Sequence, residues 1–133
     1  MKKVLTIGVF DLLHMGHVEL FRKAKALGDY LIVAVQNSEM VEKYKPGAHL
    51  VCSTEERCYM VGAIRWVDEV VTYNSSDEIV GLLDFDILAK GPDQNNEAFQ
   101  RALKIAEERG IEVVTLPRTE GISSTDLKSR VAK

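Results

Sequence analysis

Short apolar segments rich in β-branched residues alternate along the chain with segments in which apolar residues recur at helical spacing. The first kind predicts buried strands and the second predicts amphipathic helices, because side chains repeat about every 2 residues in a strand and about every 3.6 in a helix. Strands are predicted at residues 4–9, 29–35, 67–72, 86–90 and 111–116. Helices are predicted at residues 16–27, 53–65, 77–83 and 96–109, with a terminal helix from Ser123 onward.

Residues at the ends of these segments support their boundaries. Gly28 and Gly110 follow two of the predicted helices, as is usual after a helix C-terminus. Ser53 and Glu56 form a capping box, in which the hydroxyl accepts from a free amide and the carboxylate reaches back. Apolar strands joined by helices indicate parallel pairing with both faces covered. We therefore expect an α/β fold, a three-layer doubly wound parallel five-stranded sheet, as a single domain over residues 1–133.

Sheets of this kind bind ligands beyond the carboxyl ends of their strands, at the point where the strand order reverses. The loops that follow strands are therefore the candidate regions, at residues 8–17, 36–50, 90–95 and 117–125. The first of them contains Gly8, Val9, Phe10, Asp11, His14, Gly16 and His17.

The two histidines of this loop are three residues apart, so they share one face of the first helical turn. Unpaired amides and a partial positive charge make such a helix start a phosphate site, and Gly16 leaves room for the phosphate. Purely structural histidines and metal ligands remain alternatives, although no cysteine or third histidine is close in sequence. Asp11 is expected either to orient a histidine or help hold a metal-bound triphosphate, or to cap the turn.

Composition limits the classes of partner that we expect for this protein. The chain has 17 Lys+Arg against 20 Asp+Glu, a formal net charge of -3, which disfavours a duplex nucleic-acid binder. No apolar run approaches the roughly 20 residues of a membrane span, and the first residues lack the full apolar region and cleavage site expected of a signal peptide. Cys52 and Cys58 fit neither a disulfide scaffold nor a metal motif. We expect a cytoplasmic protein without nucleic-acid or membrane partners, in which local charge attracts any anionic ligand.

The histidine loop resembles the signature of a known superfamily. Residues 8–17 read Gly-x-Phe-Asp-x-x-His-x-Gly-His and resemble the H-x-G-H nucleotidyltransferases, most closely the cytidylyltransferases of the glycerol-3-phosphate type. Residues 65–70, Arg-Trp-Val-Asp-Glu-Val, and residues 118–125, Arg-Thr-Glu-Gly-Ile-Ser-Ser-Thr, are similar to two further motifs of that family. The resemblance covers essentially the whole chain. It implies a Rossmann-like nucleotidyltransferase fold and an enzyme that transfers CMP from CTP to a small phosphorylated acceptor, releasing pyrophosphate.

The resemblance also implies roles for single residues. Those expected to be catalytic are His14 and His17 at the α- and β-phosphates, Lys45 at the attacking and α-phosphates, and Arg118 at the pyrophosphate. The expected nucleotide ligands are Gly8, Val9, Phe10, Asp11, Gly16, Lys90, Gly91, Asp93, Thr119, Gly121, Ile122, Ser123, Ser124 and Thr125. Lys43 and Arg57 are candidates for the acceptor, and an ordinary helix-surface ion pair is the alternative for Arg57. Mg²⁺ is expected to bind mainly through the triphosphate. The resemblance also implies a homodimer, with residues 65–70 near its interface.

Two other functions and the identity of the acceptor stay open. The same fold could transfer an adenylyl group from ATP, although the motif at residues 118–125 and the short chain favour CTP. A non-catalytic nucleotide sensor is less favoured, because it need not keep both histidines and Arg118. Glycerol 3-phosphate is the acceptor nearest to the family, whereas phosphocholine would need an aromatic cage. Pro46 and Pro92 depart from the family pattern and leave other phosphorylated metabolites possible.

Overall fold

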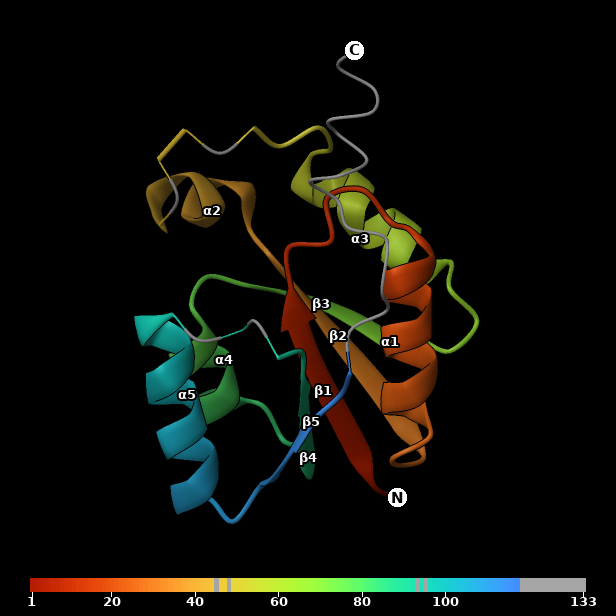
Figure 1. The fold of residues 1–133 in the computed structure, drawn as a ribbon, viewed down its shortest axis with the longest axis vertical. Coiled ribbons are helices and arrows are strands. Elements are labelled where there is room, and N and C mark those ends of the chain that lie inside the picture. The colour runs from red at the N-terminus through yellow and green to blue at the C-terminus, as the bar shows by residue number, and fades with distance from the viewer. Residues whose placement is uncertain (45, 48, 93, 95, 118–133) are drawn as a thin grey trace.

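The structure is a computed structural model that describes residues 1–44, 46–47, 49–92, 94 and 96–117. Within these residues, the strands form one parallel sheet in the order β3-β2-β1-β4-β5 (Figure 1). The strands are β1 (Lys3–Gly8), β2 (Tyr30–Gln36), β3 (Glu69–Tyr73), β4 (Ile87–Lys90) and β5 (Glu112–Thr115). The predicted five-stranded parallel sheet is therefore confirmed. The terminal helix predicted from Ser123 lies outside the described residues.

Helices cover both faces of this sheet. The helices of the described residues are α1 (Met15–Lys25), α2 (Ser38–Tyr44), α3 (Thr54–Gly62), α4 (Ser76–Leu82) and α5 (Glu97–Glu108). Figure 1 shows α1 and α3 on one face and α4 and α5 on the other, which gives the three predicted layers. None of the helices described is long and apolar enough to cross a membrane.

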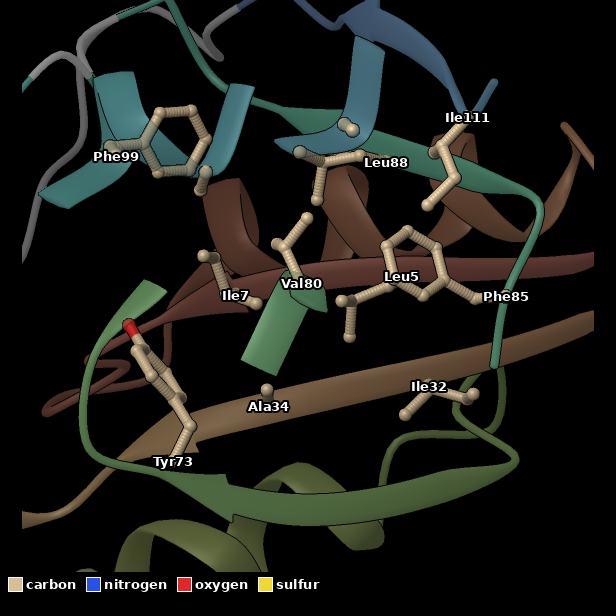
Figure 2. Packing of buried hydrophobic residues seen from close by; sticks show 12 residues of the cluster. Leu5, Ile7, Ile32, Ala34, Tyr73, Val80, Phe85, Leu88, Phe99 and Ile111 are labelled. Carbon is tan, nitrogen blue, oxygen red and sulfur yellow. The ribbon is translucent and has the colours of Figure 1, made fainter. Parts of the chain in front are cut away.

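The core lies on both sides of the central strands. β1 and β2 are buried almost throughout, as strands covered on two faces must be, and their apolar runs are the clearest strand signal in the sequence. On one face, side chains of α1 and α3 pack against the sheet through Phe21, Ala24 and Val61. On the other face, α4 and α5 do so through Val80, Phe99, Ala102 and Ala106 (Figure 2).

One predicted loop contains a helix. The sequence pattern predicts a loop over residues 36–50, but residues 38–44 form α2, which Figure 1 shows beyond the carboxyl ends of the strands. Val41 is the only residue that this helix buries. Seven residues with one buried apolar side chain give too little periodicity to reveal a helix.

The capping box before α3 is confirmed. Glu56 N donates to Ser53 Oγ at 3.1 Å, and Ser53 N donates to Glu56 Oε1 at 2.9 Å. These bonds to Ser53 lower the pKa of Glu56. The helix ends at Gly62, three residues before the predicted end.

The strand order fixes where a ligand can bind. The chain moves outward from β1 through β2 to β3 and then crosses to β4 on the other side of β1. The loops that follow β1 and β4 therefore diverge at the carboxyl edge of the sheet, which makes this edge the switch point.

Candidate active site

His14 and His17 lie together at the start of α1. His14 is the N-cap residue, and the two imidazole rings stack with their centroids 3.9 Å apart and their planes inclined by 24°. Gly16 N donates to His14 Nδ1 at 3.0 Å, and His14 N donates to His17 Nδ1 at 3.3 Å. The histidine pair thus satisfies amides of the helix start, much as Ser and Glu do in an ordinary capping box.

These hydrogen bonds decide how the rings can act. A ring nitrogen that accepts a hydrogen bond carries no proton, so in each neutral imidazole the proton is on Nε2. Burial, and then the neighbouring His14, lower the pKa of His17 from 6.5 to about 4. At neutral pH, His17 is therefore an uncharged ring with an Nε2–H donor at the N-terminus of α1.

Phe10 packs against His17 and supports the geometry of the histidine pair. Its backbone has a φ of 54°, a left-handed conformation that is uncommon for a bulky residue. Its ring packs edge-on against His17 at 5.4 Å and against Phe21 at 5.2 Å between centroids. A Cβ on Gly8 would lie 2.8 Å from Phe10 Cζ, so glycine is needed at position 8 to admit the ring.

Asp11 connects the histidine loop to the segment before α3. Its carboxylate is buried, with 6% of the residue exposed, and accepts from Val51 N at 2.9 Å and from Cys52 N at 2.8 Å. Neither expectation for Asp11 included this contact across 40 residues of sequence. Among the described residues, no group of three or more His, Cys, Asp and Glu side chains could hold a metal ion.

Arg57 lies inside the protein. Only 1% of the residue is exposed, so the predicted alternative of a helix-surface ion pair is wrong. Its five N–H groups all donate to oxygen atoms of the protein. The acceptors are Val9 O, Gln36 O, Cys52 O, Ser38 Oγ and Thr54 Oγ1. We refer to Arg57 and these acceptors as the Arg57 network.

The Arg57 network joins the ends of β1 and β2 to the starts of α2 and α3. Burial lowers the pKa of Arg57, while the nearby Asp11 carboxylate raises it. Because every N–H of the guanidinium already has a protein acceptor, this arrangement does not present Arg57 to an acceptor molecule as the sequence analysis expected.

The loop after β4 begins on the side of β1 opposite to β2. Gly91 N donates to Gln94 Oε1 at 3.1 Å, and Gln94 Nε2 donates to Ile7 O at 2.8 Å. A Cβ on Gly91 would meet nothing within 4 Å, and Lys90 Nζ lies 3.5 Å from Thr115 Oγ1. Gln94 was not among the expected residues, because a single glutamine in a loop gives no sequence signal.

A hollow of about 320 Å³ opens beside these loops. Its walls come from the ends of β1, β2 and β3, from α2, from the starts of α4 and α5, and from the loop between β4 and α5. The polar side chains among its walls are Gln36, Ser76, Gln94, Asn96, Glu97 and Arg101. The hollow lies toward the face covered by α4 and α5, whereas the histidine pair belongs to α1 on the opposite face.

Part of the predicted site cannot be placed. The expected site residues outside the described part of the chain are Lys45, Asp93, Arg118, Thr119, Gly121, Ile122, Ser123, Ser124 and Thr125. Lys43 is exposed on α2, with Nζ 6.0 Å from the ring centroid of Tyr44. The structure thus brings together the predicted residues of the first loop and leaves their partners from the last motif as predictions.

The chain is also similar to known proteins. Residues 5–130 match the family model described as Cytidylyltransferase-like. The chain belongs to the cytidylyltransferase-like family. It is 40% identical to the glycerol-3-phosphate cytidylyltransferase of Bacillus subtilis (strain 168), over 99% of this chain and 98% of that protein. The resemblance drawn from the three motifs is therefore confirmed.

Two further proteins are similar to this chain. The chain is 42% identical to the FAD synthase of Thermococcus sibiricus (strain DSM 12597 / MM 739), over 86% of this chain and 80% of that protein. The crystal structure of a lipopolysaccharide core biosynthesis protein from Thermoplasma volcanium GSS1 superposes with a TM-score of 0.71 at 25% identity. That superposition covers 92% of this chain and 99% of the other, which confirms the fold class.

Proposed function

We propose that this protein transfers CMP from CTP to the phosphate of a small phosphorylated acceptor, giving a CDP-linked product and pyrophosphate. The observation that carries the proposal is the histidine pair, which presents ring donors at the N-terminus of α1 beside the end of the central strand. The name of the relative from Bacillus subtilis, glycerol-3-phosphate cytidylyltransferase, supports both the nucleotide and the class of acceptor.

The reaction needs positioned donors rather than a general base. An oxygen of the acceptor phosphate, already anionic near neutral pH, attacks the α-phosphorus of CTP. The bond from this phosphorus to the oxygen that bridges to the β-phosphate breaks, and its electron pair leaves on pyrophosphate. His14 and His17 would donate Nε2–H to the α- and β-phosphates, where negative charge shifts during the transfer.

Cationic groups complete the proposed site. Lys45 would neutralise the attacking phosphate and the α-phosphate, and Arg118 the departing pyrophosphate. The Asp11 carboxylate already holds two backbone amides, so Mg²⁺ would bind mainly through the triphosphate, as is usual for this ion. When bound, the ion would neutralise charge on the phosphate oxygens.

Adenylyl transfer from ATP is the second candidate. The relative from Thermococcus sibiricus is named FAD synthase, and FAD contains an adenylyl group. Cytidylyl transfer is favoured because the family description and the relative from Bacillus subtilis, which spans nearly the whole chain, both point to it.

We also propose that the protein is a cytoplasmic homodimer with residues 65–70 near the interface. Tyr59 and Met60, on the preceding α3, are 78% and 51% exposed, which supports an apolar contact in this region. Light scattering of the purified protein would detect a dimer, and a monomer at micromolar concentration would contradict one.

A panel of nucleotides tests the reaction. The protein is incubated with CTP, ATP, UTP or GTP and with a library of phosphorylated small molecules, and released pyrophosphate and product mass are measured. We expect a CDP-linked product with CTP. Preference for ATP would favour adenylyl transfer, and nucleotide binding without pyrophosphate release from any pair would favour a sensor.

A further inference from the structure

The strands on the two sides of the switch point separate before they end. β1 pairs with β2 along its whole length. With β4 it pairs only at Val4↔Ile87 and Leu5↔Leu88, although the structure describes both strands to their ends. The two strands therefore diverge toward the carboxyl edge of the sheet, where folds of this kind bind their ligands.

The main-chain groups beyond this ladder show which hydrogen bond is replaced. Leu116 N donates to Lys90 O at 2.7 Å, so the main chain of Lys90 faces β5. Main-chain groups of successive residues in a strand point to opposite edges, so those of Gly91 face β1. Continued by two residues, the register of the ladder sets Ile7 beside Lys90, and Ile7 O beside the next amide, Gly91 N. A continuous parallel ladder would join these two groups directly.

Gln94 occupies the place of that bond. Gly91 N donates to Gln94 Oε1 at 3.1 Å, and Gln94 Nε2 donates to Ile7 O at 2.8 Å. We refer to these two bonds as the Gln94 bridge. A carboxamide offers both an acceptor and a donor, as a peptide group does, so it can stand between two strands and satisfy both. An unpaired main-chain group in such a part-buried position would cost about 1–3 kcal/mol.

Packing does little to hold the loop after β4 in place. A Cβ on Gly91 would meet nothing within 4 Å, and Pro92 is exposed. Without the carboxamide, Gly91 N would either bond directly to Ile7 O, which closes the opening between the strands, or lose its partner, which frees the loop. In both cases the loop after β4 would leave its position relative to the loop after β1.

We propose that Gln94 is a positioning residue that keeps β1 and β4 apart at their carboxyl ends and so fixes the loop after β4 for the nucleotide. The inference rests on the proposed cytidylyl transfer, in which Gly91 is an expected nucleotide ligand. Gln94 acts through Gly91 and Ile7, whereas the histidine pair belongs to the loop after β1. Loss of the Gln94 bridge should therefore weaken the binding of CTP and leave the chemical step nearly intact.

Gln94→Met removes the bridge. Methionine has a side chain of similar length but offers neither hydrogen bond. KM for CTP should rise about tenfold, while kcat with the acceptor that wild type uses fastest should stay within about threefold of wild type. Gln100→Met, at an exposed glutamine of α5, is the matched control and should change neither value.

Gln94→Glu can restore the bridge as pH falls, which a side chain that only fills space would not do. The ionised carboxyl cannot donate and sets a negative oxygen against Ile7 O. The protonated carboxyl donates its O–H to Ile7 O and accepts from Gly91 N, so both bonds return. The adjacent carbonyl should raise the pKa of the introduced carboxyl above its usual value of about 4.3. Glu97 and Arg101, the charged side chains among the described walls of the neighbouring hollow, act on this pKa in opposite directions.

The measurement is KM for CTP from pH 8 to pH 5.5, divided by the wild-type value at the same pH. This ratio removes the titration of CTP itself and of groups that wild type shares. For Gln94→Glu, we expect a ratio of about ten or more at pH 8 that falls at least threefold on acidification. For Gln94→Met the ratio should stay high throughout, and for Gln100→Glu it should stay near one.

The outcomes separate this inference from the proposed function. Wild-type KM for CTP in both Gln94 variants would overturn the inference and leave cytidylyl transfer standing. A ratio that does not fall with pH in Gln94→Glu would overturn it too, as would a loss of kcat larger than the rise in KM. Loss of the circular dichroism spectrum in both variants would contradict a role limited to positioning. Absence of pyrophosphate release by the wild type with CTP and every acceptor would instead refute the proposed function.

Discussion

The histidine pair and the Arg57 network both hold the loop that follows β1, but they use contacts of different range. The rings of His14 and His17 bond to amides within three residues of themselves. Arg57 bonds to Val9 and Gln36, which are 48 and 21 residues away in sequence. The short-range contacts shape the groups that can touch a ligand, and the long-range contacts hold together the loops that carry those groups.

This difference separates chemistry from support. Changes in the histidine pair are expected to affect turnover more than folding, because each ring accepts only one hydrogen bond from a nearby backbone amide. Changes in the Arg57 network are expected to affect folding first, because several part-buried oxygens would lose their donor together.

The largest expected effect is that of Arg57→Met. This substitution removes five donors from part-buried oxygens and places an apolar side chain among them, so it should lower the free energy of unfolding by about 3 kcal/mol or more. Urea denaturation measures it. Lys104→Met, at an exposed lysine of α5, is the control and should lie within about 0.5 kcal/mol of wild type. Equal stability of both variants would show that the network is dispensable.

Acidification should destabilise the protein through His17. Its pKa is about 4 in the folded state against 6.5 for an ordinary histidine, so the unfolded chain binds the proton first as pH falls. The contribution is fully present above about pH 6.5 and is lost progressively down to about pH 4. The free energy of unfolding should therefore fall between pH 7 and pH 5 by about 2 kcal/mol more in wild type than in His17→Gln. Parallel pH profiles would contradict a neutral, buried His17.

The close approach of Phe10 to Gly8 gives the next prediction. In Gly8→Ala, the new methyl group would lie 2.8 Å from the Phe10 ring, so the ring must shift. This shift would change the contact between Phe10 and His17. Overpacking of this kind should cost about 1.5 kcal/mol of stability and also lower kcat. Gly62→Ala is the control, because its Cβ would meet only Val70 Cγ2 at 3.6 Å. If both variants keep wild-type kcat, Phe10 does not position His17.

The smallest effect is expected at the start of α3. Ser53→Ala removes the acceptor of Glu56 N and should lower the free energy of unfolding by about 1 kcal/mol. Since this capping box is local and exposed, turnover at 25 °C should not change. A large loss of kcat would mean that α3 positions the site more directly than the Arg57 network suggests.

The same division explains what could be predicted from the sequence. Periodicity revealed the buried strands β1 and β2, and spacing of three residues placed His14 and His17 on one helical turn, because both signals lie within a few residues. The partners of Arg57 and Asp11 could not be found this way, since they depend on how distant loops meet at the edge of the sheet. The short helix α2 and the role of Gln94 were not predicted, because neither has a periodic pattern in the sequence.

The most direct test of the central claim, that His17 acts as a donor to the phosphates, separates its two ring nitrogens. His17→Asn keeps an acceptor close to the position of Nδ1 and so preserves the bond from His14 N, but it removes the Nε2–H donor. The measurement is kcat with CTP and the acceptor that wild type uses fastest. We expect His17→Asn to lower kcat about 100-fold with an unchanged circular dichroism spectrum. Turnover within about threefold of wild type would contradict the account and leave His17 with only its structural bond at the start of α1.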